Sequence, residues 1–292
     1  MKIITIRLLS LLALALPVLT SAASPILVPA WQSETVFEQP ESIVYDKKRE
    51  LFYVSNVNGV PNEVDGNGYI SQLSLDGKVI KQHWLTGLNA PKGMIIVGNT
   101  LYVADITELV AIDLKSNKIN MRYPAPKAKF LNDVAADNNG NIYVSDMLTN
   151  TIHRLSQGVF EIWLHDTALE APNGLLVENN NLIVASWGNM TDGFATDIAG
   201  HLKTVDITSK KIQGLGNKTP TGNLDGVEAD GDGNYYVTDW MVGKLLHITA
   251  TGTSTTLIKL DPGSADLTIL PQQKLVIIPM MMTNNILAYR IK

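Results

Sequence analysis

One phrase recurs six times along the chain, and this repetition constrains the fold more than any other feature. Each copy joins an apolar run, a turn rich in Asp, Asn or Gly, and a second run of β-branched or aromatic residues. The copies cover residues 40–56, 91–105, 131–146, 172–186, 224–239 and 265–279. A repeat of about 40–50 residues that is built from hairpins is typical of a β-propeller, in which each repeat forms one blade. We therefore predict an all-β, six-bladed β-propeller with four antiparallel strands per blade.

The first 23 residues have the pattern of a signal peptide. Basic residues in MKIITIR precede the apolar run LLSLLALALPVL, which is short for a membrane span, and small residues follow near Ala22 and Ala23. The chain has no cysteine, which suits a bacterial periplasm better than a disulfide scaffold. We expect residues 1–23 to be removed and residues 24–292 to form a single domain that is periplasmic or secreted and not held at a membrane. The alternative is an uncleaved anchor.

The last repeat lacks a fourth strand, because the chain ends with NILAYRIK. Before the first phrase lies SETVFEQ (residues 33–39), a predicted strand without a partner in its own repeat. Pairing these two segments would remove two open sheet edges. We predict that residues 33–39 close the last blade.

Two insertions of about ten residues interrupt the step from the second to the third strand of a blade, at residues 56–68 and 187–200. In an antiparallel meander the second strand ends on the face where the first strand begins. Both insertions should therefore lie on one face of the propeller, where binding sites on rigid scaffolds often occur.

A polar residue lies near the start of the first strand in every copy of the phrase. Aligning the copies groups Glu41, Lys92, Asn132, Asn173, Asp225 and Asp266. The first strand of a blade is the innermost, so these side chains should form a ring around the propeller axis. Carboxylate and amide oxygens suit a hard divalent cation, and Ca²⁺ fits best, with Mg²⁺, Mn²⁺ and Zn²⁺ as alternatives. The alternative to a metal site is a structural ring of polar side chains.

The net charge of the chain is −5, which disfavours nucleic acid as a partner because phosphate binding needs a basic surface. The chain also lacks a G-x-S-x-G motif, so a serine-triad hydrolase is not expected.

The segments PESIVYD, LNDVAAD, PNGLLVE and LDGVEADGDGNYYVTDW resemble those of the gluconolactonase family of six-bladed propellers, which includes senescence-marker and luciferin-regenerating proteins. The resemblance implies one divalent metal in the central channel and hydrolysis of sugar lactones, other lactones or related esters. The metal ligands that it implies are Glu41, Asn132, Asn173 and Asp225. It further implies that Asp225 is both a ligand and the general base, and Lys92 is a candidate catalytic residue that would assist the oxyanion or hold a substrate carboxylate.

The sequence departs from the family pattern beside two of these ligands. Glu41 is followed by Ser42-Ile43 where the family has Gly or Ser and then Pro, and KAKFLND places Phe130 and Leu131 where an arginine that contacts the substrate is expected. These changes leave the implied ligands in place but remove the basis for sugar-lactone specificity.

Two functions therefore compete. The first is an exported, metal-dependent hydrolase of the lactonase type. The second is a non-catalytic propeller that binds a peptide, glycan or protein partner and holds a structural metal in its channel. A lactonase needs an open coordination position with a pocket around it, whereas a structural metal would be fully coordinated by protein.

Overall fold

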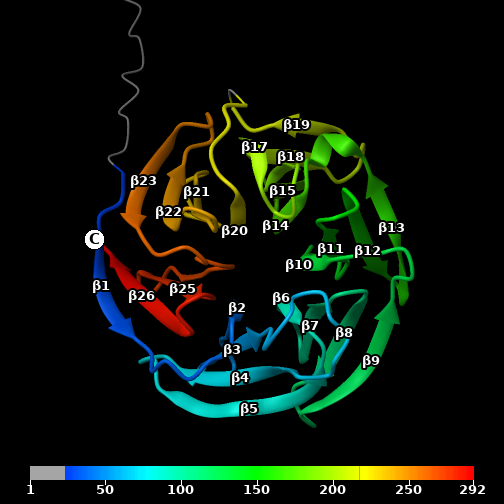
Figure 1. The fold of residues 1–292 in the computed structure, drawn as a ribbon, viewed down its shortest axis with the longest axis vertical. Coiled ribbons are helices and arrows are strands. Elements are labelled where there is room, and N and C mark those ends of the chain that lie inside the picture. The colour runs from blue at the N-terminus through cyan, green and yellow to red at the C-terminus, as the bar shows by residue number, and fades with distance from the viewer. Residues whose placement is uncertain (1–23, 217) are drawn as a thin grey trace, which may run out of the picture.

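The computed structural model describes residues 24–216 and 218–292, which fold into a six-bladed β-propeller. Six four-stranded antiparallel sheets stand side by side around a central axis (Figure 1). The predicted signal peptide, residues 1–23, lies outside the described residues. In the described part of the chain no helix is long and apolar enough to span a membrane.

The first three blades follow the repeat in chain order, and each runs from an innermost to an outermost strand. Blade 1 consists of β2 (Pro40–Asp46), β3 (Leu51–Asn56), β4 (Gly68–Ser74) and β5 (Val79–Leu88). Blade 2 consists of β6 (Pro91–Val97), β7 (Thr100–Asp105), β8 (Glu108–Asp113) and β9 (Lys118–Pro124). Blade 3 consists of β10 (Leu131–Ala136), β11 (Ile142–Asp146), β12 (Thr151–Ser156) and β13 (Val159–His165), and a short 3₁₀ helix, η1 (Thr167–Leu169), follows it.

The second half of the ring contains one additional hairpin. Blade 4 consists of β14 (Pro172–Glu178), β15 (Asn181–Ser186), β18 (Leu202–Asp206) and β19 (Ile212–Gly214). Between its second and third strands, β16 (Gly188–Met190) and β17 (Thr196–Ala199) form a separate two-stranded sheet. Blade 5 consists of β20 (Leu224–Ala229), β21 (Tyr235–Asp239), β22 (Lys244–Ile248) and β23 (Ser254–Lys259). Blade 6 consists of β24 (Thr268–Leu270), β25 (Leu275–Met280), β26 (Asn285–Ile291) and the N-terminal β1 (Leu27–Gln32).

The N-terminal segment closes the ring as predicted, but with a different strand. β1 pairs antiparallel with β26, from Leu27 opposite Ile291 to Gln32 opposite Leu287. The prediction that residues 33–39 form this strand is wrong, because this segment has to carry the chain from the outer edge of blade 6 to the innermost strand of blade 1. On its way it buries Phe37 between these two blades.

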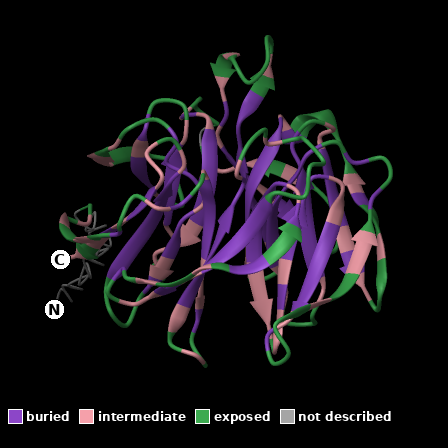
Figure 2. Ribbon diagram, turned by 60° about the horizontal axis from the view of Figure 1, so that its bottom comes forward, coloured by how far each residue is buried: buried purple, intermediate pink, exposed green. Residues whose placement is uncertain are grey.

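The core is divided among the contacts between neighbouring blades. Six apolar clusters lie between adjacent sheets, for example Tyr53 and Ile70 of blade 1 against Leu101 and Val103 of blade 2. Figure 2 shows that buried residues dominate the strands, whereas exposed residues gather on the loops. Because all six contacts bury apolar side chains, the blades form one continuous body around the channel.

The turns between first and second strands explain the Asp-rich sequence at this position. Asp230 accepts hydrogen bonds from the backbone N–H groups of Asp232 and Asn234 and from the Asn234 amide. Asp137 binds Asn139 and Asn141 in the same way. This Asx geometry holds a tight hairpin turn.

Candidate metal and substrate site

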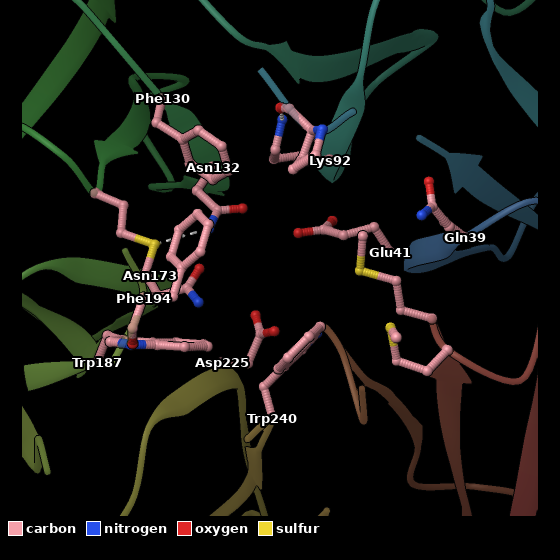
Figure 3. Close-up of a pocket in the computed structure, with 14 residues that line it drawn as sticks. Gln39, Glu41, Lys92, Phe130, Asn132, Asn173, Trp187, Phe194, Asp225 and Trp240 are labelled. Atoms are coloured by element: carbon pink, nitrogen blue, oxygen red, sulfur yellow. Dashed lines mark hydrogen bonds between the residues drawn. The ribbon is translucent and has the colours of Figure 1, made fainter. Parts of the chain in front are cut away.

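Five of the six predicted ring residues meet at one end of the central channel. We call this end the mouth; it is the face on which the innermost strands begin and the second strands end. A cavity of about 220 Å³ opens here, the mouth cavity, and its polar lining residues are Gln39, Glu41, Lys92, Asn132, Asn173 and Asp225. Figure 3 shows the carboxyl groups of Glu41 and Asp225 and the amide groups of Asn132 and Asn173 turned toward a common space. The sequence repeat therefore identified residues that come together in the fold.

Asp266 does not belong to this ring. In the other blades, the first residue of the innermost strand pairs with the last residue of the second strand, and the ring residue comes next. In blade 1, for example, Pro40 pairs with Asn56, and Glu41 is the ring residue. In blade 6 the corresponding pair is Ser264 with Met280, so Ala265 takes the ring position. Asp266 lies one residue further along the channel, where it forms a bridge with Ser42.

Glycines directly after ring residues allow the innermost strands to approach one another. A Cβ atom on Gly93, next to Lys92, would lie 2.2 Å from Oδ1 of Asp133 on the neighbouring strand. At Gly174, next to Asn173, it would lie 1.9 Å from the backbone oxygen of Asp225. Neither position has room for a side chain, and the close approach brings the ring residues toward the axis.

Polar residues that end the second strands fix the backbone just before the ring residues. The Asp105 carboxylate accepts from the backbone N–H groups of Asn89 and Ala90, two to three residues before Lys92. The Asp146 carboxylate accepts from those of Lys129 and Phe130. These carboxylates therefore hold the entry segments that lead to the ring residues.

Three oxygens at the floor of the mouth cavity are buried and lack a hydrogen-bond partner among the described residues. They are Glu41 Oε2, Asn132 Oδ1 and Asn173 Oδ1. An unpartnered buried oxygen costs free energy, and three together beside the Asp225 carboxylate form a donor set that suits a hard divalent cation. Among residues 24–216 and 218–292 no three Asp, Glu, His or Cys side chains form a metal-binding group, so such a site depends on the two amides.

Burial and mutual repulsion disfavour the charged forms of the ring carboxylates. Burial first, and then the charges of Asp225 and Asp266, raise the pKa of Glu41 well above its usual range. Burial and Asp266 raise the pKa of Asp225 in the same direction. Carboxylates in this state gain from a cation that neutralises them, which agrees with the unpartnered oxygens.

Lys92 lines the cavity, but its ammonium group is engaged elsewhere. It donates to the backbone oxygens of Pro61 at 2.8 Å and Ala90 at 2.9 Å, and it lies 4.4 Å from the centroid of the Phe130 ring. Burial lowers the pKa of Lys92 to about 8, against the opposing effect of Glu41 and Asp105. These contacts tie the 56–68 loop to blade 2, and a catalytic role for Lys92 stays a prediction.

The walls of the mouth cavity are apolar, and the sequence reasoning identified them only in part. Both insertions contribute, with Pro61 from one and Phe194 from the other, which confirms that they lie at the mouth. The remaining apolar lining residues are Phe130, Met147, Trp187, Trp240, Met281 and Met282. The sequence feature that could have identified Phe194 is an aromatic residue within an insertion that is expected on the binding face.

A second cavity of about 120 Å³, the lower cavity, lies further along the innermost strands. Its acidic lining residues are Asp133, Glu228 and Asp266. The chain itself supplies their partners: Asp133 accepts from the backbone of Val134 and Leu175, and Asp266 accepts from the Ser42 hydroxyl at 2.6 Å.

Fold and site together define a six-bladed propeller that carries oxygen donors at the mouth of its channel. The family model described as the SMP-30/gluconolactonase/LRE-like region matches residues 39–269, and the chain belongs to this family. The match includes all four implied metal ligands. None of the curated proteins compared with the chain matches it.

Solved structures share the fold at low sequence identity. A gluconolactonase from Xanthomonas campestris superimposes with a TM-score of 0.66 at 12% identity, covering 92% of this chain and 90% of that one. Virginiamycin B lyase from Staphylococcus aureus gives a TM-score of 0.63 at 14% identity, covering 91% and 99%. A catalytically inactive variant of that lyase with quinupristin gives 0.61 at 14% identity, with the same coverage. At these identities the likeness extends to the fold alone.

Proposed function

We propose that this protein is a metal-dependent hydrolase of the lactonase type, with one divalent cation, Ca²⁺ by preference, at the floor of the mouth cavity. The ligands in this proposal are Glu41, Asn132, Asn173 and Asp225. The observation that carries it is the set of three buried, unpartnered oxygens beside the Asp225 carboxylate. Membership in a family that includes gluconolactonases supports the reaction class.

In the proposed reaction, water adds to the lactone carbonyl carbon, the ring C–O bond breaks and the ring oxygen takes a proton, giving a hydroxy acid. The bound ion would supply Lewis-acid polarisation of the carbonyl. Asp225 would accept the proton of the attacking water on its carboxylate. The apolar walls would limit the water near the reacting carbonyl to the attacking molecule.

The position of the donor set favours an enzyme over a non-catalytic propeller with a structural metal. The donors lie at the floor of an open cavity, so a cation bound by them would have one side facing the space in which a substrate carbonyl fits. Figure 3 shows this space between the four side chains. A structural metal would instead be enclosed by protein on all sides.

The test is a titration of the purified protein with Ca²⁺, Mg²⁺, Mn²⁺ and Zn²⁺ during hydrolysis of a lactone panel. Turnover that requires a metal and disappears in Asp225→Ala supports the proposal. Metal binding without turnover of any lactone supports the non-catalytic alternative, and no metal binding overturns both.

We also propose that the protein is exported after removal of residues 1–23. The support is the charged, apolar and small-residue order of MKIITIR, LLSLLALALPVL and TSAAS. Mass spectrometry of the protein expressed in a Gram-negative host should find a periplasmic chain that begins near Ala23 or Ser24. A full-length chain in the membrane fraction would contradict export by cleavage.

A further inference from the structure

We propose that the substrate is a lactone with an apolar substituent and few hydroxyl groups, rather than a sugar lactone. This inference rests on the proposed lactonase function and adds the substrate class. It depends on the walls of the mouth cavity, whereas the proposed function depends on its floor.

One wall is a continuous series of aromatic rings, the aromatic arc, formed by Phe130, Phe194, Trp187 and Trp240. The ring centroids of Phe130 and Phe194 are 5.8 Å apart, those of Phe194 and Trp187 6.1 Å, and those of Trp187 and Trp240 6.0 Å. Met147, Met281 and Met282 add thioether surface to the lining. Aromatic rings and methionine side chains favour contact with apolar groups of varied shape.

Several polar atoms near this wall are already engaged within the chain. The Trp187 indole N–H donates to the backbone oxygen of Phe194 at 2.8 Å, and the Lys92 ammonium donates to Pro61 and Ala90. The Gln39 side-chain oxygen accepts from the backbone N–H of Gly59.

The Asn132 amide nitrogen faces the sulfur of Met147 at 3.7 Å. Within the described part of the lining, the unpartnered buried atoms are therefore acceptor oxygens at the floor, where the cation is proposed. The hydroxyl groups of a sugar lactone would lose more hydrogen bonds to water here than these largely apolar walls can replace, which costs free energy.

The apolar surface continues outward from the cavity along the rim. Phe194 and Met282 line the cavity and also reach solvent, at 38% and 60% exposure. Val242, in the loop after β21, and Val60, in the 56–68 loop, add exposed apolar side chains on the same face. A cavity of about 220 Å³ accommodates a small ring, and the rim provides a path for a longer substituent.

The test compares two δ-lactones with the same ring, one bearing a pentyl chain and one polyhydroxylated, as substrates of the metal-loaded protein. We expect kcat/KM for the pentyl-substituted lactone to be at least about 100-fold higher, the range in which apolar pockets discriminate. Phe194→Ser should lower kcat/KM for the pentyl lactone by about 10-fold and so narrow the difference between the two lactones.

Ile198→Ser is the matched control, because Ile198 belongs to the same hairpin, is 67% exposed and does not line the cavity. It should leave both rates unchanged. Equal effects of the two variants, or a preference for the polyhydroxylated lactone, would overturn the inference while leaving the proposed function in place.

A binding experiment separates this inference from the failure of lactone hydrolysis itself. The pentyl-substituted δ-lactam, which resists hydrolysis, is titrated while tryptophan fluorescence is followed. If no lactone is hydrolysed, lactam binding that weakens in Phe194→Ser but not in Ile198→Ser still supports an apolar ligand. If the lactam does not bind, the inference is overturned.

Discussion

The two cavities along the channel both gather carboxylates but give them different partners. At the lower cavity the chain supplies hydrogen bonds to Asp133 and Asp266 from backbone N–H groups and the Ser42 hydroxyl. At the mouth, oxygens of Glu41, Asn132 and Asn173 have no such partner within residues 24–216 and 218–292. Buried charge alone therefore does not identify a binding site in this protein; unpartnered oxygens at the floor of a cavity do.

The largest expected effect follows from removing Asp225. Asp225→Ala removes both a ligand and the proposed base, so kcat/KM for lactone hydrolysis should fall by at least about 1,000-fold. Circular dichroism and the melting temperature should show that the fold is retained. A variant that keeps substantial activity would mean that the mouth is not the catalytic end of the channel.

The next prediction compares the loss of one carboxylate at the mouth with the loss of one carboxylate at the lower cavity. Glu41→Gln should weaken Ca²⁺ binding, measured by calorimetry, by at least about 100-fold, because it removes one of two anionic ligands. Asp266→Asn, at the lower cavity, should weaken Ca²⁺ binding by less than about 10-fold, because the Asp266 carboxylate already has the Ser42 hydroxyl as a partner. Equal losses would show that overall negative charge, rather than the donor set, holds the cation.

A smaller effect is expected at Lys92. Lys92→Met retains an apolar chain against Phe130 but removes both hydrogen bonds to Pro61 and Ala90. The free energy of unfolding, measured in urea, should fall by about 1–3 kcal/mol. Lys129→Met, at an exposed position of the neighbouring entry segment, should leave it unchanged. If Lys92→Met is as stable as the parent chain but has lost activity, Lys92 acts on the substrate instead.

The last prediction concerns pH and the lower cavity. Burial raises the pKa of Glu228 to about 8, compared with about 4.3 in an unfolded chain. Its contribution to stability is therefore fully present below about pH 4 and is lost as pH rises to 8. Glu228→Gln should remove this loss, so that the free energy of unfolding relative to the parent chain increases by about 3–4 kcal/mol between pH 5 and 8. Parallel stability curves would contradict this assignment.

The sequence allowed the blades and most of the ring to be predicted, because both depend on local patterns that recur. The hairpin phrase placed Glu41, Asn132, Asn173 and Asp225 at equivalent positions before any contact was known. Asp266 was misassigned because its blade lacks the Pro or Leu that begins the other phrases, and only strand pairing shows the shift of one residue.

Other features depend on the route of the chain through the fold, which a local sequence pattern does not encode. Residues 33–39 read as a strand, but the chain has to cross from the outside of the propeller to its centre at this point. The aromatic arc joins residues of three blades, and Phe194 reaches Phe130 only because the hairpin of β16 and β17 folds over the mouth. Trp187 and Trp240 were equally consistent with core packing from the sequence alone.

The most direct test of the cation site is a calorimetric Ca²⁺ titration of Asn132→Ala/Asn173→Ala beside Glu228→Gln/Asp266→Asn. The first double variant keeps every titratable group in the channel, and the second removes two carboxyl groups from the lower cavity. We predict that the parent chain and the second variant bind one Ca²⁺ per chain, and that the first variant binds none. Binding that survives in the first variant and disappears in the second would contradict a cation site at the mouth.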